Sequence, residues 1–161
     1  MPKIEISTFI IADRQRVFDL ARSLDLHMIS TSKTNEKAIA GRLDGLIELG
    51  ETVTWRAKHL GVYQRLKVKI TRFERPAYFQ DEMISGAFKS FVHEHYFIGN
   101  DNGETQMKDV FTYHSPFGII GRLVDFLFLK KYMTNLLINR NEVIKEYAES
   151  DQWKSVISMS Q

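Results

Sequence analysis

The segment "DVFTYHSPFGIIGRLVDFLFLKKYM", residues 109–133, decides the fold because its residue pattern changes from strand to helix. Residues 104–114 have the aromatic and alternating character of a β-strand. From about Gly121 to Ala148, apolar residues recur at helical spacing without an interior proline or glycine. A single helix of this length would extend about 40 Å. We therefore expect it to pack along a sheet built by the preceding strands.

Strand-like segments and short turns fill most of the chain before that helix. Turn-forming Gly, Pro, Asn and Asp residues separate the segments at the spacing of an antiparallel meander. After the first strand, Asp13 is a good N-cap for a helix of about three turns ending near residues 23–25, and residues 26–36 leave room for another short helical piece. The predicted strands are residues 3–11, 36–41, 46–59, 62–73, 77–85, 89–98 and 104–114.

This order of elements predicts an α+β fold. We expect a strongly curved antiparallel sheet of about six or seven strands wrapped around the long C-terminal helix, with one or two short helices after the first strand. The chain has 161 residues, of which 43% are apolar and 26% charged, enough for one core but not for two independent ones. The predicted domain covers residues 1–149, and residues 150–161 form a tail.

Charge and cysteine content argue against several functional classes. The 22 basic and 20 acidic residues are interleaved and give a net charge of +2, so we expect no nucleic-acid partner. The absence of cysteine rules out disulfides, thiolate metal sites and cysteine nucleophiles. Charged residues interrupt the most apolar segment, residues 117–138, so no membrane span is expected. With no signal-like pattern at residues 1–11, we expect a cytoplasmic protein.

Strand alternation predicts which side chains face the interior. In "ETVTWRAKHL", residues 51–60, Arg56 and Lys58 share one face, which places Trp55 and His59 on the other. The same test applied to the later strands puts two carboxylates and further imidazoles on this inner face. The polar and aromatic residues predicted to face inward are Trp55, His59, Asp81, His93, His95, Asp109 and Tyr113.

The sequence resembles a known family in several of these segments. "TVTWRAKHLG" (52–61), "FQDEMISGAF" (79–88), "HEHYF" (93–97), the segment 109–133 and "LLINRNEVIK" (136–145) resemble the bacterial SRPBCC proteins of the START and birch-pollen-allergen-like superfamily, often labelled polyketide cyclase/dehydrase-like. The resemblance extends from the first strand to about Tyr147. It implies a helix-grip fold with a deep hydrophobic cavity for lipids, sterols, polyketides or similar molecules. It brings no catalytic motif that can be assigned residue by residue.

The inward histidines and acids allow three interpretations. His93 and His95, two apart on one strand face, could share a metal ion with His59, Asp81 or Asp109 as a third ligand, but strand histidine pairs are more often hydrogen-bonded lining or core residues, and we predict no metal site. An acid/base group is the second interpretation, with His93, His95, Asp81 and Asp109 as candidate catalytic residues and Tyr113 as a donor. A structural polar network that fixes strand register is the third.

Other residues bear on how a cavity would be bounded. Arg140 interrupts an apolar stretch of the long helix and could reach toward Asp109, toward a ligand carboxylate, or out to solvent. The bend at residues 114–121 and residues 26–33 are either lips of a cavity mouth or plain connectors.

The predicted function is binding of a hydrophobic or amphipathic small molecule, lipid-like or polyketide-like, between the sheet and the C-terminal helix. The alternatives are a cyclase- or hydrolase-type enzyme that uses the His/Asp group, and a packed non-catalytic interaction domain. We expect no cofactor, a hydrophobic small molecule as partner, and a monomer or homodimer. The predicted ligand-binding residues are Trp55, His59, Leu66, Val68, Phe79, Met83, Phe91, His95, Phe111, Tyr113, Leu123, Leu127 and Met133.

Overall fold

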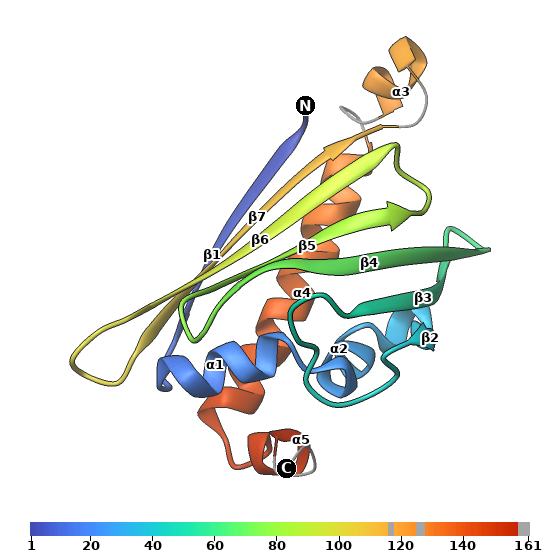
Figure 1. Ribbon diagram of the computed structural model, residues 1–161. Helices are drawn as coiled ribbons and strands as arrows, with labels where there is room; N and C mark the ends of the chain where they lie inside the picture. The colour runs from blue at the N-terminus through green and yellow to red at the C-terminus, as the bar shows by residue number, and fades with distance from the viewer. Residues whose placement is uncertain (116–117, 125–127, 158–161) are drawn as a thin grey trace.

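The predicted α+β architecture is confirmed in the structure, a computed structural model that describes residues 1–115, 118–124 and 128–157 (Figure 1). Its seven strands form one antiparallel sheet in the order β1-β7-β6-β5-β4-β3-β2. The sheet bends around helix α4 (Lys130–Glu149). The strands are β1 (Lys3–Ile10), β2 (Lys37–Gly41), β3 (Thr52–His59), β4 (Val62–Glu74), β5 (Tyr78–Ser85), β6 (Ser90–Gly99) and β7 (Thr105–His114).

Two short helices follow β1, in agreement with the one or two that were predicted. Asp13 caps α1 (Arg14–Ala21) by accepting a hydrogen bond from the Arg16 amide at 3.0 Å. The prediction that this helix continues to residues 23–25 is wrong, because the Ser23 side chain accepts from the Leu26 amide and starts α2 (Leu24–Ser30). A single 3₁₀ turn, η1 (Ser32–Thr34), leads to β2.

Helix α1 packs on the inner face of the sheet, and Phe18 makes its ring contacts. The ring of Phe18 makes edge-on contacts with Phe73, Phe79 and Phe97, with centroid separations of 5.3, 5.7 and 5.3 Å. Such contacts add to the area that each ring buries. They place the end of α1, and with it Ala21 and Arg22, beside the space between the sheet and α4.

Helix α4 buries one stripe of side chains. Leu137, Arg140, Asn141, Ile144 and Ala148 are buried at intervals of one, three or four residues, which places them on one face of the helix. Helix α4 runs along the sheet (Figure 1), and Asn141 on this stripe reaches Thr8 of β1 and Asp109 of β7. The helix thus contributes two polar residues, Arg140 and Asn141, to the interior.

The helix predicted over residues 121–148 is confirmed for α4, and residues 125–127 of that prediction lie outside the described residues. A separate helix α3 (Gly118–Val124) lies beyond the end of the sheet, away from α4 (Figure 1). Its Ile119, Ile120 and Leu123 are exposed. Helical spacing of apolar residues is the same in one long helix and in two successive helices, and only α4 has a sheet to pack on.

The strand predicted over residues 46–59 begins later than expected. Gly50 has a left-handed backbone, with φ of 81°, and β3 starts at Thr52. Leu46 forms only an isolated bridge with Ser23. The other strands differ from their predicted bounds by one residue at each end or less.

Residues 150–157 return to the body of the protein. Helix α5 (Trp153–Ile157) buries Val156, and the Arg16 guanidinium lies 4.4 Å from the centroid of the Trp153 ring. Among the described residues, no helix is long and apolar enough to cross a membrane.

The first testable prediction concerns the edge of the sheet at Gly41. This residue has φ of 75°, and a Cβ atom there would lie 2.2 Å from the Thr52 carbonyl oxygen. We expect Gly41→Ala to lower the unfolding free energy by about 1–2 kcal/mol because alanine is strained in a left-handed conformation. Displacement of β2 from β3 should lower it by a further ~2 kcal/mol or more. Gly50→Ala is the matched control, because φ is 81° and no atom lies within 4 Å of its added Cβ. Equal losses in urea unfolding would contradict the prediction.

Candidate functional site

A cavity of about 410 Å³ lies between the concave face of the sheet and α4. Its lining is mostly apolar and aromatic, and comes from α2, β3, β4, β5, β6, β7 and α4. Alternation along the strands brings these side chains to one face. Of the residues predicted from the sequence to bind a ligand, Trp55, His59, Leu66, Val68, Phe79, Phe91, His95, Phe111 and Met133 line this cavity.

Three of the predicted ligand-binding residues do not line it. Leu123 is 62% exposed on α3, away from the cavity. Tyr113 is fully buried, and the Phe88 ring, 5.3 Å away between centroids, lines the cavity beside it. Met83 packs partly buried against the core without reaching the lining. Leu127 lies outside the described residues.

The register of three strands assembles the central polar network. His95 on β6 lies directly opposite Asp109 on β7, and His93 lies opposite Asp81 on β5. Asp109 Oδ1 accepts hydrogen bonds from His95 Nδ1 at 2.8 Å and from His93 Nε2 at 3.1 Å. His95 Nε2 donates to Asp81 Oδ1 at 2.9 Å. All four sequence candidates for acid/base residues therefore belong to one network, although Asp109 lies behind the lining.

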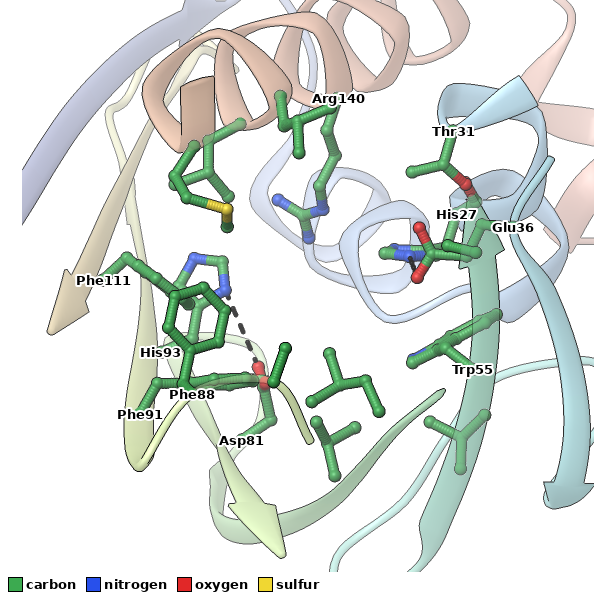
Figure 2. Close-up of a pocket in the computed structure, with 18 of the residues that line it drawn as sticks. His27, Thr31, Glu36, Trp55, Asp81, Phe88, Phe91, His93, Phe111 and Arg140 are labelled. Carbon is green, nitrogen blue, oxygen red and sulfur yellow. Dashed lines mark hydrogen bonds and ion pairs between the residues drawn. The ribbon is translucent and has the colours of Figure 1, made fainter. Parts of the chain in front are cut away.

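Two residues of α4 complete this network. Asn141 Nδ2 donates to Asp109 Oδ2 at 2.6 Å. Arg140 Nη1 lies 3.5 Å from Asp109 Oδ1 and donates to the Asn141 side-chain oxygen, while Nη2 donates to the Ala21 carbonyl at 3.0 Å. Of the directions left open by the sequence, Arg140 takes the one toward Asp109: it is only 7% exposed, and its guanidinium projects into the cavity (Figure 2).

The network holds ionised acids and one protonated imidazole. Burial raises the pKa of Asp109, but hydrogen bonds from His93 and His95 outweigh burial and hold that pKa well below its usual range. Burial also lowers the pKa of His95, but its hydrogen bonds to Asp109 and Asp81 raise the pKa overall. Because a carboxylate only accepts, both nitrogens of His95 carry protons. Burial raises the pKa of Asp81, but the hydrogen bond from His95 lowers it by more, so the pKa of Asp81 lies below its ordinary value.

His93 differs from His95 in its protonation. Burial and the charge of His95 lower the pKa of His93 below its ordinary value. Its Nε2 donates to Asp109, so the neutral ring presents an unprotonated Nδ1, which makes no hydrogen bond among the described residues and lies 3.9 Å from Asp81 Oδ1. An imidazole oriented by a buried carboxylate, with its other nitrogen unprotonated, has the form of a general base.

The same residues have the spacing of metal ligands. One ligand atom from each of Asp81, His93 and His95 lies within 4.8 Å of the others. However, His95 already donates from both nitrogens to carboxylates. A metal ion would have to displace one of those protons, so the geometry favours the hydrogen-bonded network over metal ligation.

A second polar group, which the sequence did not reveal as a unit, lies on the other side of the cavity. His27 Nε2 lies 3.2 Å from Glu36 Oε1, and the His27 ring stacks on Trp55 with a centroid separation of 4.3 Å. Burial raises the pKa of Glu36, but the close pairing with the His27 imidazole lowers it overall. Thr31 also lines this part of the cavity (Figure 2). His27 and Thr31 fall in residues 26–33, considered as a lip, whereas Glu36 looked only like the start of a strand.

The opening of the cavity is marked by lining residues that are exposed. The exposed lining residues include Leu60 in the β3–β4 turn, Ala87 between β5 and β6, and Phe128 before α4. Beside them, His59 Nδ1 and the Tyr132 hydroxyl lie 2.9 Å apart and connect the sheet to α4. Ser115 lines the cavity at the bend predicted as a lip, Gly118 does not, and Pro116 lies outside the described residues.

The second testable prediction concerns the two buried imidazoles. At pH 6.5, the ordinary histidine pKa, we expect His95 to be more than half protonated and His93 less than half. The folded pKa of His95 lies above its unfolded value, so its contribution to stability is complete below that unfolded value and is lost as pH rises through the folded pKa. Long-range ¹H–¹⁵N NMR of the histidine rings measures both states. Identical titration of the two rings would refute the assignment.

The third prediction tests the carboxylate they share. Asp109→Asn keeps the shape but leaves Arg140 without its buried counter-charge and leaves His95 with Asp81 alone. We expect a loss of about 3–5 kcal/mol in unfolding free energy at pH 6. Asp101→Asn, in the exposed turn between β6 and β7, should change stability by less than about 0.5 kcal/mol. A loss below ~1 kcal/mol for Asp109→Asn would show that the network carries little charge.

Comparison with known proteins identifies the fold. No protein-family model matches the chain, and no curated protein matches it by sequence. Among solved structures it is similar to a protein from Thermus thermophilus (TM-score 0.69, 20% identity, covering 89% of this chain and 97% of that chain). It is also similar to a START superfamily protein from Mycobacterium smegmatis (0.70, 9%, 91% and 97%) and to major latex-like protein 151 from Panax ginseng (0.69, 14%, 92% and 98%). The chain therefore has the START-like helix-grip fold, which confirms the resemblance found in its sequence at the level of the fold.

Proposed function

We propose that the protein binds an apolar small molecule carrying at least one polar group in the cavity between the sheet and α4. The observation that carries the proposal is a cavity of about 410 Å³ in which a largely apolar lining surrounds a few convergent polar groups. Ligand sites in proteins typically enclose ~300–1,000 Å³ with this kind of lining. The fold shared with the START superfamily protein agrees with such a role.

The polar network suggests which group of the ligand it would receive. Its charges balance, since Asp81 and Asp109 are offset by Arg140 and protonated His95. It offers the cavity acceptors at Asp81 and at His93 Nδ1, and a donor at Arg140. A hydroxyl group can both donate and accept. We therefore favour a neutral hydroxyl group over a carboxylate, which Asp81 would repel.

The alternatives expected from the sequence rank below binding. A packed interaction domain would fill its interior with its own side chains. The cavity of about 410 Å³ is instead many times the ~30 Å³ of one water molecule, which disfavours this alternative. Acid/base chemistry at His93 would come second to binding, because a general base acts only on a molecule that the cavity already holds.

The fourth prediction tests occupancy of the cavity. Ala57 lines the cavity on β3, so Ala57→Phe should fill part of it. We expect the wild-type protein to bind 1-decanol, measured by calorimetry and by thermal stabilisation, and the variant to bind it at least ~10-fold more weakly because ligand and ring compete for the same space. Native mass spectrometry of freshly purified protein would detect a retained ligand.

Thr54→Phe, on the half-exposed outer face of the same strand, is the matched control and should bind as the wild type does. The proposal fails if 1-decanol does not bind the wild-type protein, or if Ala57→Phe and Thr54→Phe bind it equally well.

A further inference from the structure

We infer that the ligand is elongated, with a hydrogen-bonding group at each end, and that Glu36 accepts a hydrogen bond from a hydroxyl or amine at the second end. This inference rests on the proposed binding function and deepens it. It assigns a role to the group formed by Glu36, His27 and Thr31, which the network around Asp109 does not include.

The two polar groups occupy opposite walls of one cavity. Glu36 immediately precedes the edge strand β2, whereas Asp81 and His93 lie on β5 and β6. Four strand steps separate β2 from β6, or roughly 19 Å measured along the curved sheet. Figure 2 shows the Glu36 carboxylate facing the cavity on one side, with His93 and Asp81 on the other.

The wall between them is apolar. In the sheet order, β3 and β4 separate the two groups, and they contribute Val53, Trp55, Val68 and Ile70 to the lining. All four side chains are buried. A molecule that contacts both polar groups must therefore have an apolar body, because a polar one would lose its hydrogen bonds to water without replacement.

Glu36 can serve only as an acceptor for a ligand. Its side chain is 11% exposed and its Oε1 lies 3.2 Å from His27 Nε2. Burial raises the pKa of Glu36, but the contact with the His27 imidazole outweighs burial and holds that pKa below its ordinary value. An ionised carboxylate has about four acceptor positions and no donor, so it retains capacity for a further donor from the cavity side. A ligand ending in a carboxylate would be repelled there.

Trp55 makes this wall rigid. One face of its ring is stacked on His27, the partner of Glu36, and Trp55 itself is 5% exposed. The stacking fixes the imidazole that positions the carboxylate. Glu36 is thus held in place before a ligand binds, and ordering it costs little upon binding.

The experiment compares three probes that differ only at one end: 1-decanol, 1,10-decanediol and 10-amino-1-decanol. Their chains are flexible, and three strand steps, or roughly 14 Å along the curved sheet, separate β2 from Asp81 on β5. Calorimetry would give the affinity of each probe for the wild type, Glu36→Gln and Glu36→Asp. Glu82→Gln is the matched control, since Glu82 is a half-buried glutamate on the outer face of β5, hydrogen-bonded to Gln80 and Thr71.

We expect Glu36→Gln to weaken binding of the amine by about 10- to 100-fold, since a hydrogen bond to a charged group contributes that much. The same substitution should weaken binding of the diol by a smaller factor. The Glu36→Asp variant, whose carboxylate is retracted by one methylene, should bind each of these two probes with an affinity between those of the wild type and Glu36→Gln. Binding of 1-decanol should stay unchanged in every variant, which also shows that each is folded. The ratio of the diol and amine effects distinguishes hydroxyl from amine ligands.

Two outcomes would overturn the inference, and only the second of them would also overturn the proposed binding function. If 1-decanol binds and both difunctional probes bind Glu36→Gln as tightly as the wild type, Glu36 receives no ligand group and the proposed cavity binding stands. If none of the probes binds the wild-type protein, the binding function and the inference fail together.

Discussion

The buried carboxylate of Asp109 is the interaction on which the rest of the interior depends. It receives hydrogen bonds from His93 and His95 on β6 and from Asn141 on α4, and lies near Arg140 on the same helix. An ionised carboxylate without such partners could not remain buried, because desolvation would far outweigh any packing gain. With them, one side chain joins two strands to the helix. These bonds, together with the buried apolar residues Leu137 and Ile144, hold α4 above the sheet and so maintain the space beneath it.

Such a network is not the cheapest way to hold a helix on a sheet. Well-packed apolar residues of similar volume stabilise a protein as well as buried ion pairs do, or better. What the polar network adds is orientation: it directs one nitrogen of His93 and the guanidinium of Arg140 toward the cavity. Together with Glu36 and His27, these groups give an otherwise apolar cavity two polar walls. The cavity is therefore suited to position a ligand as well as to enclose one.

The fold and the polar groups support different kinds of conclusion. The similar solved structures named here share 9–20% identity with the chain over about nine-tenths of its length, which fixes the fold and leaves the ligand open. The proposed ligand class comes instead from this chain's own side chains. Asp81, His93 and Arg140 at one wall and Glu36 at the other are what distinguish its cavity from a merely apolar one.

Local pattern determined the strands, their inward faces and the first helix cap. Adjacent side chains of a strand point to opposite faces, so charged Arg56 and Lys58 were enough to place Trp55 inside. The same reasoning placed Asp81, His93, His95 and Asp109 on one face. The tertiary structure decided what pattern cannot encode. Helical spacing did not separate α3 from α4, and nothing near Glu36 in the sequence indicated that it faces the same cavity as His93. Which side chains meet across a cavity depends on the curvature of the whole sheet and the position of the helix, and both arise from contacts between residues far apart in the chain.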